Sequence, residues 1–341
     1  MQQSRSRMIK FGLYLLSLVI LVYVVVYMPT PYMINQPGTA EELKPMVSVQ
    51  GGDTEEKGTF MLTTVSVSYA NLAMLITSQF DANAEVVRKE PDRNEQEYKT
   101  EQKYYMSSAQ SNAIVAAYNK TNVPYDIVPE YVFIVGLSKT IQTKGDFQSG
   151  DMITKLNGTP VGKLDDLATL LEGKVAGGIV PVELKREGKV LNQQVELVEI
   201  GGDSGISKAG LGVSVGEVRK IKPRDPGNEV TFADTKIGGP SAGLMFTLEI
   251  YNQLTPGDLT KGYRIAGTGT MSGDGTVGAI GGVQFKIVAS NREHAEIFFV
   301  PEANYSDAKA KAEQIGSTMK IIPVKHVDDA LKYIEQLEPK A

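Results

Sequence analysis

The chain has 341 residues, with 40 acidic and 35 basic side chains and a formal net charge of −5. This length allows two compact domains, and the modest, dispersed charge gives no electrostatic support for nucleic-acid binding. Cysteine is absent, which excludes thiol catalysis and disulfides. Only two histidines occur, His294 and His326. The sequence also has no HExxH motif and no GxxxxGK[ST] loop, so we expect no metal, no cofactor and no ATP.

The N-terminal segment contains an uncharged run at residues 11–28, FGLYLLSLVILVYVVVYM. Its length at ~1.5 Å per residue comes close to the ~30 Å hydrocarbon core of a bilayer. Arg5, Arg7 and Lys10 precede the run, which predicts a cytoplasmic N-terminus (1–10), a single-pass anchor (11–30) in the cell membrane and an extracellular remainder. A cleavable signal peptide is the alternative, but the run is long for one and no A-x-A-like site follows it.

Residues 31–117 are predicted to form an extracytoplasmic mixed α/β region. Residues 59–68 (TFMLTTVSVS) indicate a strand and residues 70–80 (ANLAMLITSQF) a short amphipathic helix. The charged residues 92–105 precede apolar residues at helical spacing in 107–118. We interpret these charges as a solvated helix face without a catalytic role.

Residues 118–200 change to short strands broken by glycine turns. A buried strand at 131–137 and the string GDMITKLNGTPV are followed by a helix at 164–171 and a hairpin around Glu187-Gly188. This pattern resembles the PDZ domains of bacterial proteases, which implies binding of a peptide as an added strand at a sheet edge. No Gly-Leu-Gly-Phe-like carboxylate loop precedes Tyr131, so a structural or regulatory role is also open.

A serine follows a glycine-rich turn in the segment 235–254, TKIGGPSAGLMFTLEIYNQL. Gly238 and Gly239 permit a close approach, Pro240 fixes a dihedral angle, and Ser241 is predicted to open a helix. The unpaired N–H groups of a helix N-terminus would favour a developing oxyanion. Serine is also a preferred N-cap, so this segment alone fits an ordinary helix start equally well.

A lysine lies in a second glycine-rich segment, RIAGTGTMSGDGTVGAIGGVQFKIVAS at residues 264–290. Lys286 is predicted on the first turns of a helix, among apolar neighbours (Val283, Phe285, Ile287, Val288). Desolvation would lower the pKa of its ammonium group, and a neutral lysine can serve as general base toward a serine hydroxyl. Taken alone, the residue equally fits a surface lysine whose stem packs on apolar surface.

Together the two segments resemble the proteolytic domain of Lon proteases over about 202–333. The resemblance rests on GPSAG at 239–243, GGVQFK ending at Lys286 45 residues after the serine, AGTG at 266–269 and GTVGAIGG at 275–282. It implies a Ser-Lys dyad with Ser241 as nucleophile and Lys286 as base. It also implies supporting residues for the oxyanion site and for the lysine (Gly239, Pro240, Ala242, Thr268).

The order of anchor, PDZ-like domain (118–200) and Lon-like domain (201–341) resembles the ATP-independent, PDZ-containing Lon-like proteases on the surface of Gram-positive bacteria. This implies an α+β fold with a catalytic domain of the ribosomal protein S5 domain 2-like type. It further implies an extracytoplasmic endopeptidase that cleaves peptides or unfolded, membrane-proximal proteins through an acyl-enzyme, and a possible homo-oligomeric ring. Gly238 stands where many Lons carry an acidic residue, and the histidines that some Lons have upstream of the serine are missing; neither difference touches the dyad.

Expected elements of the C-terminal domain are strands near 211–217, 230–233, 263–269, 297–300 and 320–323, and helices near 241–254, 283–291, 305–315 and 327–337. Two other functions fit parts of the pattern. An α/β-hydrolase could use the GxSxG string with Asp274 and His326, although ~140 residues are few for that fold and no HGGG-like segment occurs. A catalytically inactive, membrane-tethered PDZ scaffold is the other alternative.

Overall fold

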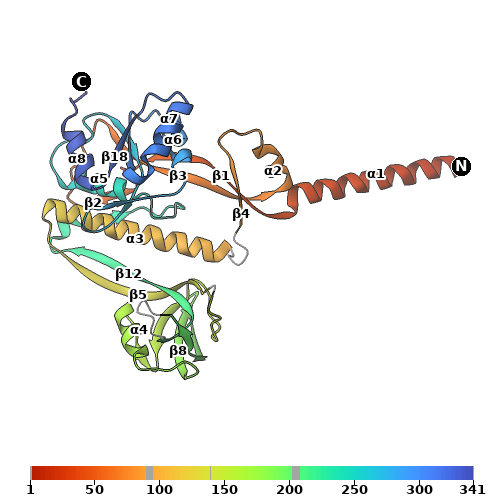
Figure 1. Ribbon diagram of the computed structural model, residues 1–341, viewed down its shortest axis with the longest axis horizontal. Helices are drawn as coiled ribbons and strands as arrows, with labels where there is room; N and C mark the ends of the chain where they lie inside the picture. Colours follow the sequence, from red (N-terminus) through yellow and green to blue (C-terminus); the bar gives the residue numbers. More distant parts are fainter. Residues whose placement is uncertain (1, 90–94, 139, 202–207, 341) are drawn as a thin grey trace.

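The computed structural model describes residues 2–89, 95–138, 140–201 and 208–340. Helix α1 (Gln2–Tyr27) projects from one end of the molecule (Figure 1). Within it, Ile9–Tyr27 forms a stretch of 19 residues that is apolar and long enough to cross a membrane. The protein does not bury this apolar stretch. The predicted apolar N-terminal helix is therefore present.

The main body contains a six-stranded sheet in the order β18-β17-β14-β3-β1-β4. Its strands, in this order, are Lys320–Val324, Ile297–Pro301, Arg264–Gly267, Thr59–Asn71, Pro29–Glu42 and Glu85–Arg88. Strand β14 pairs in parallel with β17 on one side and with β3 on the other. The sequence predicted that 31–117 and 201–341 are separate regions. The sheet joins them into one body, because the buried strand β14 pairs with β3 of the N-terminal segment.

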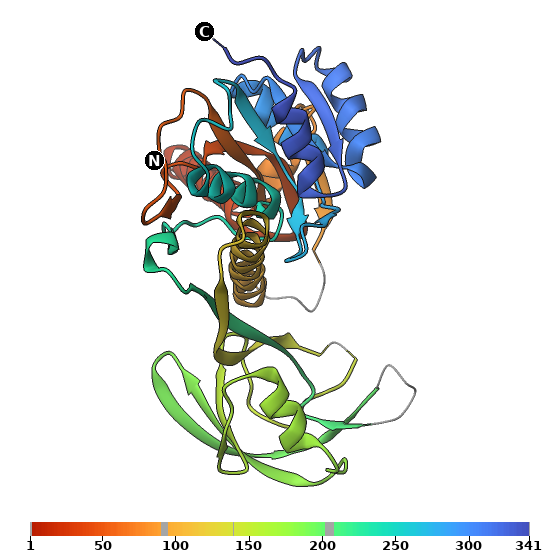
Figure 2. The ribbon, with the colours of Figure 1, turned by 90° about the vertical axis from the view of Figure 1, so that its left-hand side faces the viewer.

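The helices of the main body pack on this sheet or on one another. They are α2 (Leu72–Ser78), α3 (Glu95–Thr121), α5 (Gly243–Leu254), α6 (Val283–Arg292), α7 (Tyr305–Gln314) and α8 (Val327–Glu335). Short strands β2 (Val47–Val49), β13 (Val230–Phe232), β15 (Thr270–Met271) and β16 (Val277–Gly278) pair as β13-β2 and β15-β16. Of the charged and apolar stretches at 92–105 and 107–118, the residues from Glu95 onward form the single long helix α3, while 92–94 lie outside the described residues. The apolar C-terminal half of α3 packs into the same core as α5 (Figure 2).

Two paired strands, β5 (Tyr125–Leu137) and β12 (Val213–Pro223), connect a second domain to the main body (Figure 2). Its sheet has the order β12-β5-β6-β8-β9, with β6 (Met152–Leu156), β8 (Ile179–Arg186), β9 (Lys189–Glu196) and the short β7 (Thr159–Pro160) beside β6. Helix α4 (Leu164–Leu171) and the pair β10 (Val198–Ile200) and β11 (Lys208–Gly210) complete it. The domain has its own apolar core. The predicted α+β fold is confirmed, and strand β12, predicted within the segment 201–341, lies in the sheet of this second domain.

Candidate active site

Ser241 lies in a turn just before helix α5, which begins at Gly243, two residues later than predicted. The N-cap of the helix is Ala242, so the alternative in which Ser241 merely caps the helix is wrong. The carbonyl oxygen of Ser241 accepts hydrogen bonds from the N–H of Gly269 at 2.8 Å and from the hydroxyl of Thr268 at 3.0 Å. These bonds fix the backbone of the serine and leave its hydroxyl free to face the site.

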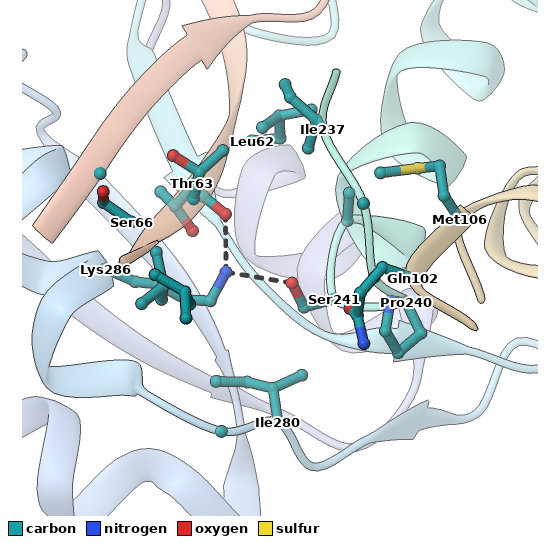
Figure 3. A pocket seen from close by; sticks show the side chains of 18 of the residues that line it. Leu62, Thr63, Ser66, Gln102, Met106, Ile237, Pro240, Ser241, Ile280 and Lys286 are labelled. Carbon is teal, nitrogen blue, oxygen red and sulfur yellow. Dashed lines mark hydrogen bonds between the residues drawn. The ribbon is translucent and has the colours of Figure 1, made fainter. Parts of the chain in front are cut away.

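Lys286 is the fourth residue of α6 and is only 3% exposed. Its Nζ lies 3.0 Å from Oγ of Ser241 and donates a hydrogen bond to the carbonyl oxygen of Thr63 at 2.6 Å (Figure 3). Burial away from water lowers the pKa of this amino group from 10.5 to about 7, because a buried ammonium ion loses its hydration. The interpretation as a surface lysine is therefore wrong.

This arrangement suits proton transfer from the serine hydroxyl. A neutral amino group has one lone pair and two N–H groups, and Thr63 takes one of these N–H groups. The lone pair can then accept the proton of the Ser241 hydroxyl, which lies at hydrogen-bonding distance. The two side chains thus meet the geometric requirement for a serine nucleophile and a lysine base, without a histidine.

The dyad opens onto a cleft of about 1000 Å³. Its walls come from β1, β3, α3, the turn before α5 and the loop before α6 (Figure 3). Side chains of α3 that line it include Tyr98, Gln102 and Met106. The charges at 92–105 were interpreted as a solvated helix face without a catalytic role, so the contribution of α3 to the site is a finding of the structure.

The two glycines before the serine allow α3 to approach closely, as the sequence indicated. A Cβ on Gly238 would lie 2.8 Å from Cβ of Gln102, and one on Gly239 would lie 2.9 Å from Oε1 of the same residue. Gly239 has φ of +91° and its N–H donates to the carbonyl oxygen of Gln102 at 2.9 Å. Gly239 therefore shapes the turn, and its N–H is already used.

Not every backbone N–H group around Ser241 is available as a hydrogen-bond donor to an oxyanion. Pro240 has no N–H and can only fix the backbone. Among the hydrogen bonds of the described residues, none takes the N–H of Ser241 or of Ala242. These two N–H groups, at the start of α5, are the ones available to a developing negative charge.

Thr268 acts on a different partner from the one that the resemblance implied. Its buried hydroxyl donates to the carbonyl oxygen of Ser241, whereas Lys286 is held by the carbonyl oxygen of Thr63. The side chain of Thr63 in turn donates to the carbonyl oxygen of Gly267 at 3.1 Å and ties β3 to β14. Sequence reasoning missed Thr63, because a backbone carbonyl leaves no side-chain motif.

His326 serves a structural purpose. Its Nδ1 accepts from the N–H of Asp328 at the start of α8, and its Nε2 lies 2.8 Å from the carbonyl oxygen of Asp274. No histidine is among the described residues that line the cleft, so the triad of an α/β-hydrolase is not assembled around Ser241. Within the described ranges, no group of three or more His, Cys, Asp or Glu residues could hold a metal ion.

The second domain has no Gly-Leu-Gly-Phe-like string before Tyr131, as noted from the sequence, but a similar string occurs before another strand of its sheet. Gly210-Leu211-Gly212-Val213 leads into β12, the edge strand that pairs with β5, rather than preceding Tyr131. Gly212 has φ of +72°, and the carbonyl oxygen of Leu211 accepts from the hydroxyl of Thr143 at 2.7 Å. The sequence signal was present but lies after the hairpin in chain order.

Comparison with known proteins identifies both domains. Residues 233–336 match the Lon protease (S16) C-terminal proteolytic domain, and residues 129–197 match the PDZ domain. The chain is similar to the Lon protease of Elusimicrobium minutum, with 38% identity over 104 residues, 30% of this chain and 12% of that one. It is also similar to the Lon protease of Aster yellows witches'-broom phytoplasma, with 30% identity over 96 residues, 28% of this chain and 12% of that one.

The chain thus matches about an eighth of the length of these Lon proteases. Among solved structures, the PDZ domain of the SdrC-like protein of Listeria monocytogenes aligns with 17% identity and a TM-score of 0.23, covering 25% of this chain and 87% of that one. The chain carries a Lon-type S16 proteolytic domain, the domain of Ser-Lys dyad serine peptidases, joined to a PDZ domain. The predictions of both domains are confirmed.

Proposed function

We propose that this protein is a membrane-anchored, ATP-independent serine endopeptidase in which Ser241 is the nucleophile and Lys286 the general base. The observation that carries the proposal is the 3.0 Å contact between Oγ of Ser241 and the buried Nζ of Lys286, at the wall of an open cleft. A pKa of about 7 leaves a large fraction of this amino group neutral near physiological pH.

The reaction begins when Oγ of Ser241 attacks the scissile carbonyl carbon while Nζ of Lys286 accepts its proton. The N–H groups of Ser241 and Ala242 stabilise the oxyanion of the tetrahedral intermediate. The Lys286 ammonium then gives its proton to the leaving amine, and the peptide bond breaks to leave an acyl-enzyme on Ser241. Lys286 deprotonates a water molecule that attacks the ester, and the serine regains its proton as the acid leaves.

The cleft supports binding of an extended peptide. Strand β14 pairs with β3 only as far as Leu62, so the next residues of β3 pair with β1 alone among the described strands. Residues 63–67 of β3 line the cleft beside the dyad. A free strand edge can take up a peptide as an added strand, which favours peptides and unfolded protein segments as substrates.

Placement at the membrane rests on α1. The apolar stretch Ile9–Tyr27 would remain as an anchor, with the basic N-terminus in the cytoplasm and the two domains outside. The free edge of β12 in the PDZ domain would bind peptide segments and bring them to the protease body. A homo-oligomeric ring, as the resemblance implies, belongs to the same proposal.

The test is cleavage of unfolded casein and of a fluorogenic peptide by the full chain in nanodiscs. We expect Ser241→Ala and Lys286→Ala to abolish cleavage and His326→Ala to retain it, with folding checked by thermal unfolding. Lys325→Ala, at an exposed lysine outside the cleft, is the matched control. Cleavage that persists in Ser241→Ala, or no cleavage by the wild type, would refute the proposal, and the latter would favour the scaffold.

A further inference from the structure

Helix α2 is attached to the outer end of the apolar span. Asn71, the N-cap of α2, accepts from the N–H of Met74 at 2.8 Å and donates through Nδ2 to the carbonyl oxygen of Val26 at 2.7 Å. Val26 belongs to the last turn of the stretch Ile9–Tyr27. Figure 1 shows α2 beside the end of α1, where α1 meets the body of the protein.

The surface of α2 is unusual for a helix exposed to water. Residues 72–80, LAMLITSQF, contain no charged side chain. Leu72, Ile76 and Phe80 are 37%, 57% and 87% exposed, and their spacing of four places them along one side of the helix and its C-terminal continuation. Three large apolar side chains exposed in a row mark a surface that another apolar phase covers.

The length of the span fixes the depth at which this surface lies. Nineteen residues rise by about 28 Å, close to the thickness of the hydrocarbon core, so Val26 lies at its outer boundary. The stacked rings of Tyr23 and Tyr27 occupy the same turn, and tyrosines are enriched at this boundary. Tyr69 lies two residues before Asn71, and Nζ of Lys89 lies 5.1 Å from the centre of its ring. This ammonium group is a cation that can reach lipid headgroups.

We propose that α2 docks on the lipid surface, with Leu72, Ile76 and Phe80 inserted at the boundary between headgroups and acyl chains beside α1. The occupant of this apolar face is therefore the membrane in which α1 is anchored. This inference rests on the proposed retention of α1 as an anchor. It adds a second, interfacial attachment, which restricts the tilt and rotation of the protease body above the membrane.

The docking also sets the height of the catalytic cleft. Strand β3 runs without interruption from Thr63, which holds Lys286, to Asn71, which holds the end of the span. Eight residues of strand span about 26 Å, so the dyad lies at roughly this height above the lipid surface. Substrate segments within reach are those that leave the same membrane in an extended form.

The chain contains no tryptophan, so single-tryptophan variants report on depth without a chemical label. We compare Ile76→Trp and Phe80→Trp with Val22→Trp in α1 and with Val190→Trp on β9, an exposed position in the PDZ domain. The full chain is reconstituted in phosphatidylcholine vesicles that contain lipids brominated near the headgroup end of the acyl chain. Peptide cleavage by each variant verifies its fold.

We expect the tryptophans at positions 76 and 80 to be quenched by brominated lipid and blue-shifted, as at position 22, and the tryptophan at position 190 to be neither. Quenching at 22 without quenching at 76 and 80 would overturn the lipid contact while leaving the anchor intact. Absence of quenching at position 22 would overturn the anchor and, with it, this inference. A blue shift at 76 and 80 without quenching, lost on dilution of the protein in the vesicles, would assign the face to a second copy of the chain and also overturn the inference.

Discussion

The Nζ atom of Lys286 and the carbonyl oxygen of Thr63 lie 2.6 Å apart, although 223 positions separate the two residues in the chain. This bond joins the helix that carries the base to a strand of the N-terminal segment. The same strand, β3, is the neighbour of β14 in the sheet. The Lon-type match begins only at residue 233, yet the catalytic unit includes strands that precede the PDZ domain.

We therefore predict that residues 208–340 alone fail to fold into an active peptidase. Without β1 and β3, the strand β14 exposes a buried edge and Lys286 loses its acceptor. Circular dichroism, thermal unfolding and peptide cleavage measure the effect. The control removes residues 138–212 and joins Leu137 to Val213, which are directly paired on β5 and β12, through an Asn-Gly turn. That chain should fold and cleave short peptides; activity in the isolated C-terminal part would contradict the prediction.

The pH dependence of cleavage should follow the amino group of Lys286. Its pKa of about 7 separates an inactive ammonium form at lower pH from an active neutral form at higher pH. We expect kcat/KM for a peptide without titratable groups to rise about tenfold per pH unit below the pKa and to level off above it. Lys286→Arg should be inactive across the range, because its guanidinium group stays charged. A flat profile with chemistry rate-limiting would contradict the role of Lys286 as base.

The turn before Ser241 offers a test that separates backbone strain from catalysis. Gly239→Ala places a Cβ on a residue with φ of +91°, against Oε1 of Gln102, and should shift the serine. Gly257→Ala is the matched control, since Gly257 has φ of +94° but no atom near the added Cβ. Both changes should cost about 1–2 kcal/mol of stability. Only Gly239→Ala should reduce kcat, on the order of 10- to 100-fold, as measured by steady-state cleavage; equal activities would show that the turn does not position Ser241.

Much of the site follows from local sequence. The glycines before Ser241 predicted a close approach, because this effect depends on nearby residues. The apolar neighbours of Lys286 favoured a lowered pKa but fitted a surface lysine equally well, and the resemblance decided between the two. The partners in these contacts could not be predicted in the same way. Gln102 contacts the glycines from a charged stretch that the sequence predicted to be a solvated helix face. Thr63 contributes only its backbone carbonyl, which any residue would supply.

In the fold, too, local features were predictable from the sequence and long-range contacts were not. The strand expected near 211–217 forms part of β12 in the sheet of the second domain, whereas the other strands and the helices expected in the C-terminal domain lie close to their predicted positions, since their apolar periodicity is local. The sharing of one sheet between 31–117 and the C-terminal domain depends on long-range pairing, which periodicity does not encode. The position of Gly210-Leu211-Gly212-Val213 at the start of β12 likewise depends on which strand lies beside β5.

A buried carboxyl group, that of Glu249, lies on the helix that follows Ser241 and faces the half-buried Glu56 from the loop before β3. Glu249 in α5 is fully buried, and burial first, then repulsion by Glu56, raises its pKa from 4.5 to about 7. Burial also raises the pKa of Glu56, while Lys44 opposes the shift of both groups. Nε2 of Gln253 donates to one oxygen of Glu249 at 2.6 Å, and the other oxygen has no partner among the described residues.

This pair should make the protein less stable as the pH rises. Between about pH 4.5 and 7 the folded chain keeps a proton on Glu249 that the unfolded chain has lost, so the free energy of unfolding decreases with pH in this window. Glu249→Gln keeps the bond from Gln253 and removes the charge. It should raise the free energy of unfolding at pH 8 by on the order of 2–3 kcal/mol and have little effect at pH 4.5. Urea unfolding at the two pH values measures this, with Glu313→Gln on the exposed face of α7 as control; an equal gain at both pH values would mean that the charge of Glu249 is not the cause.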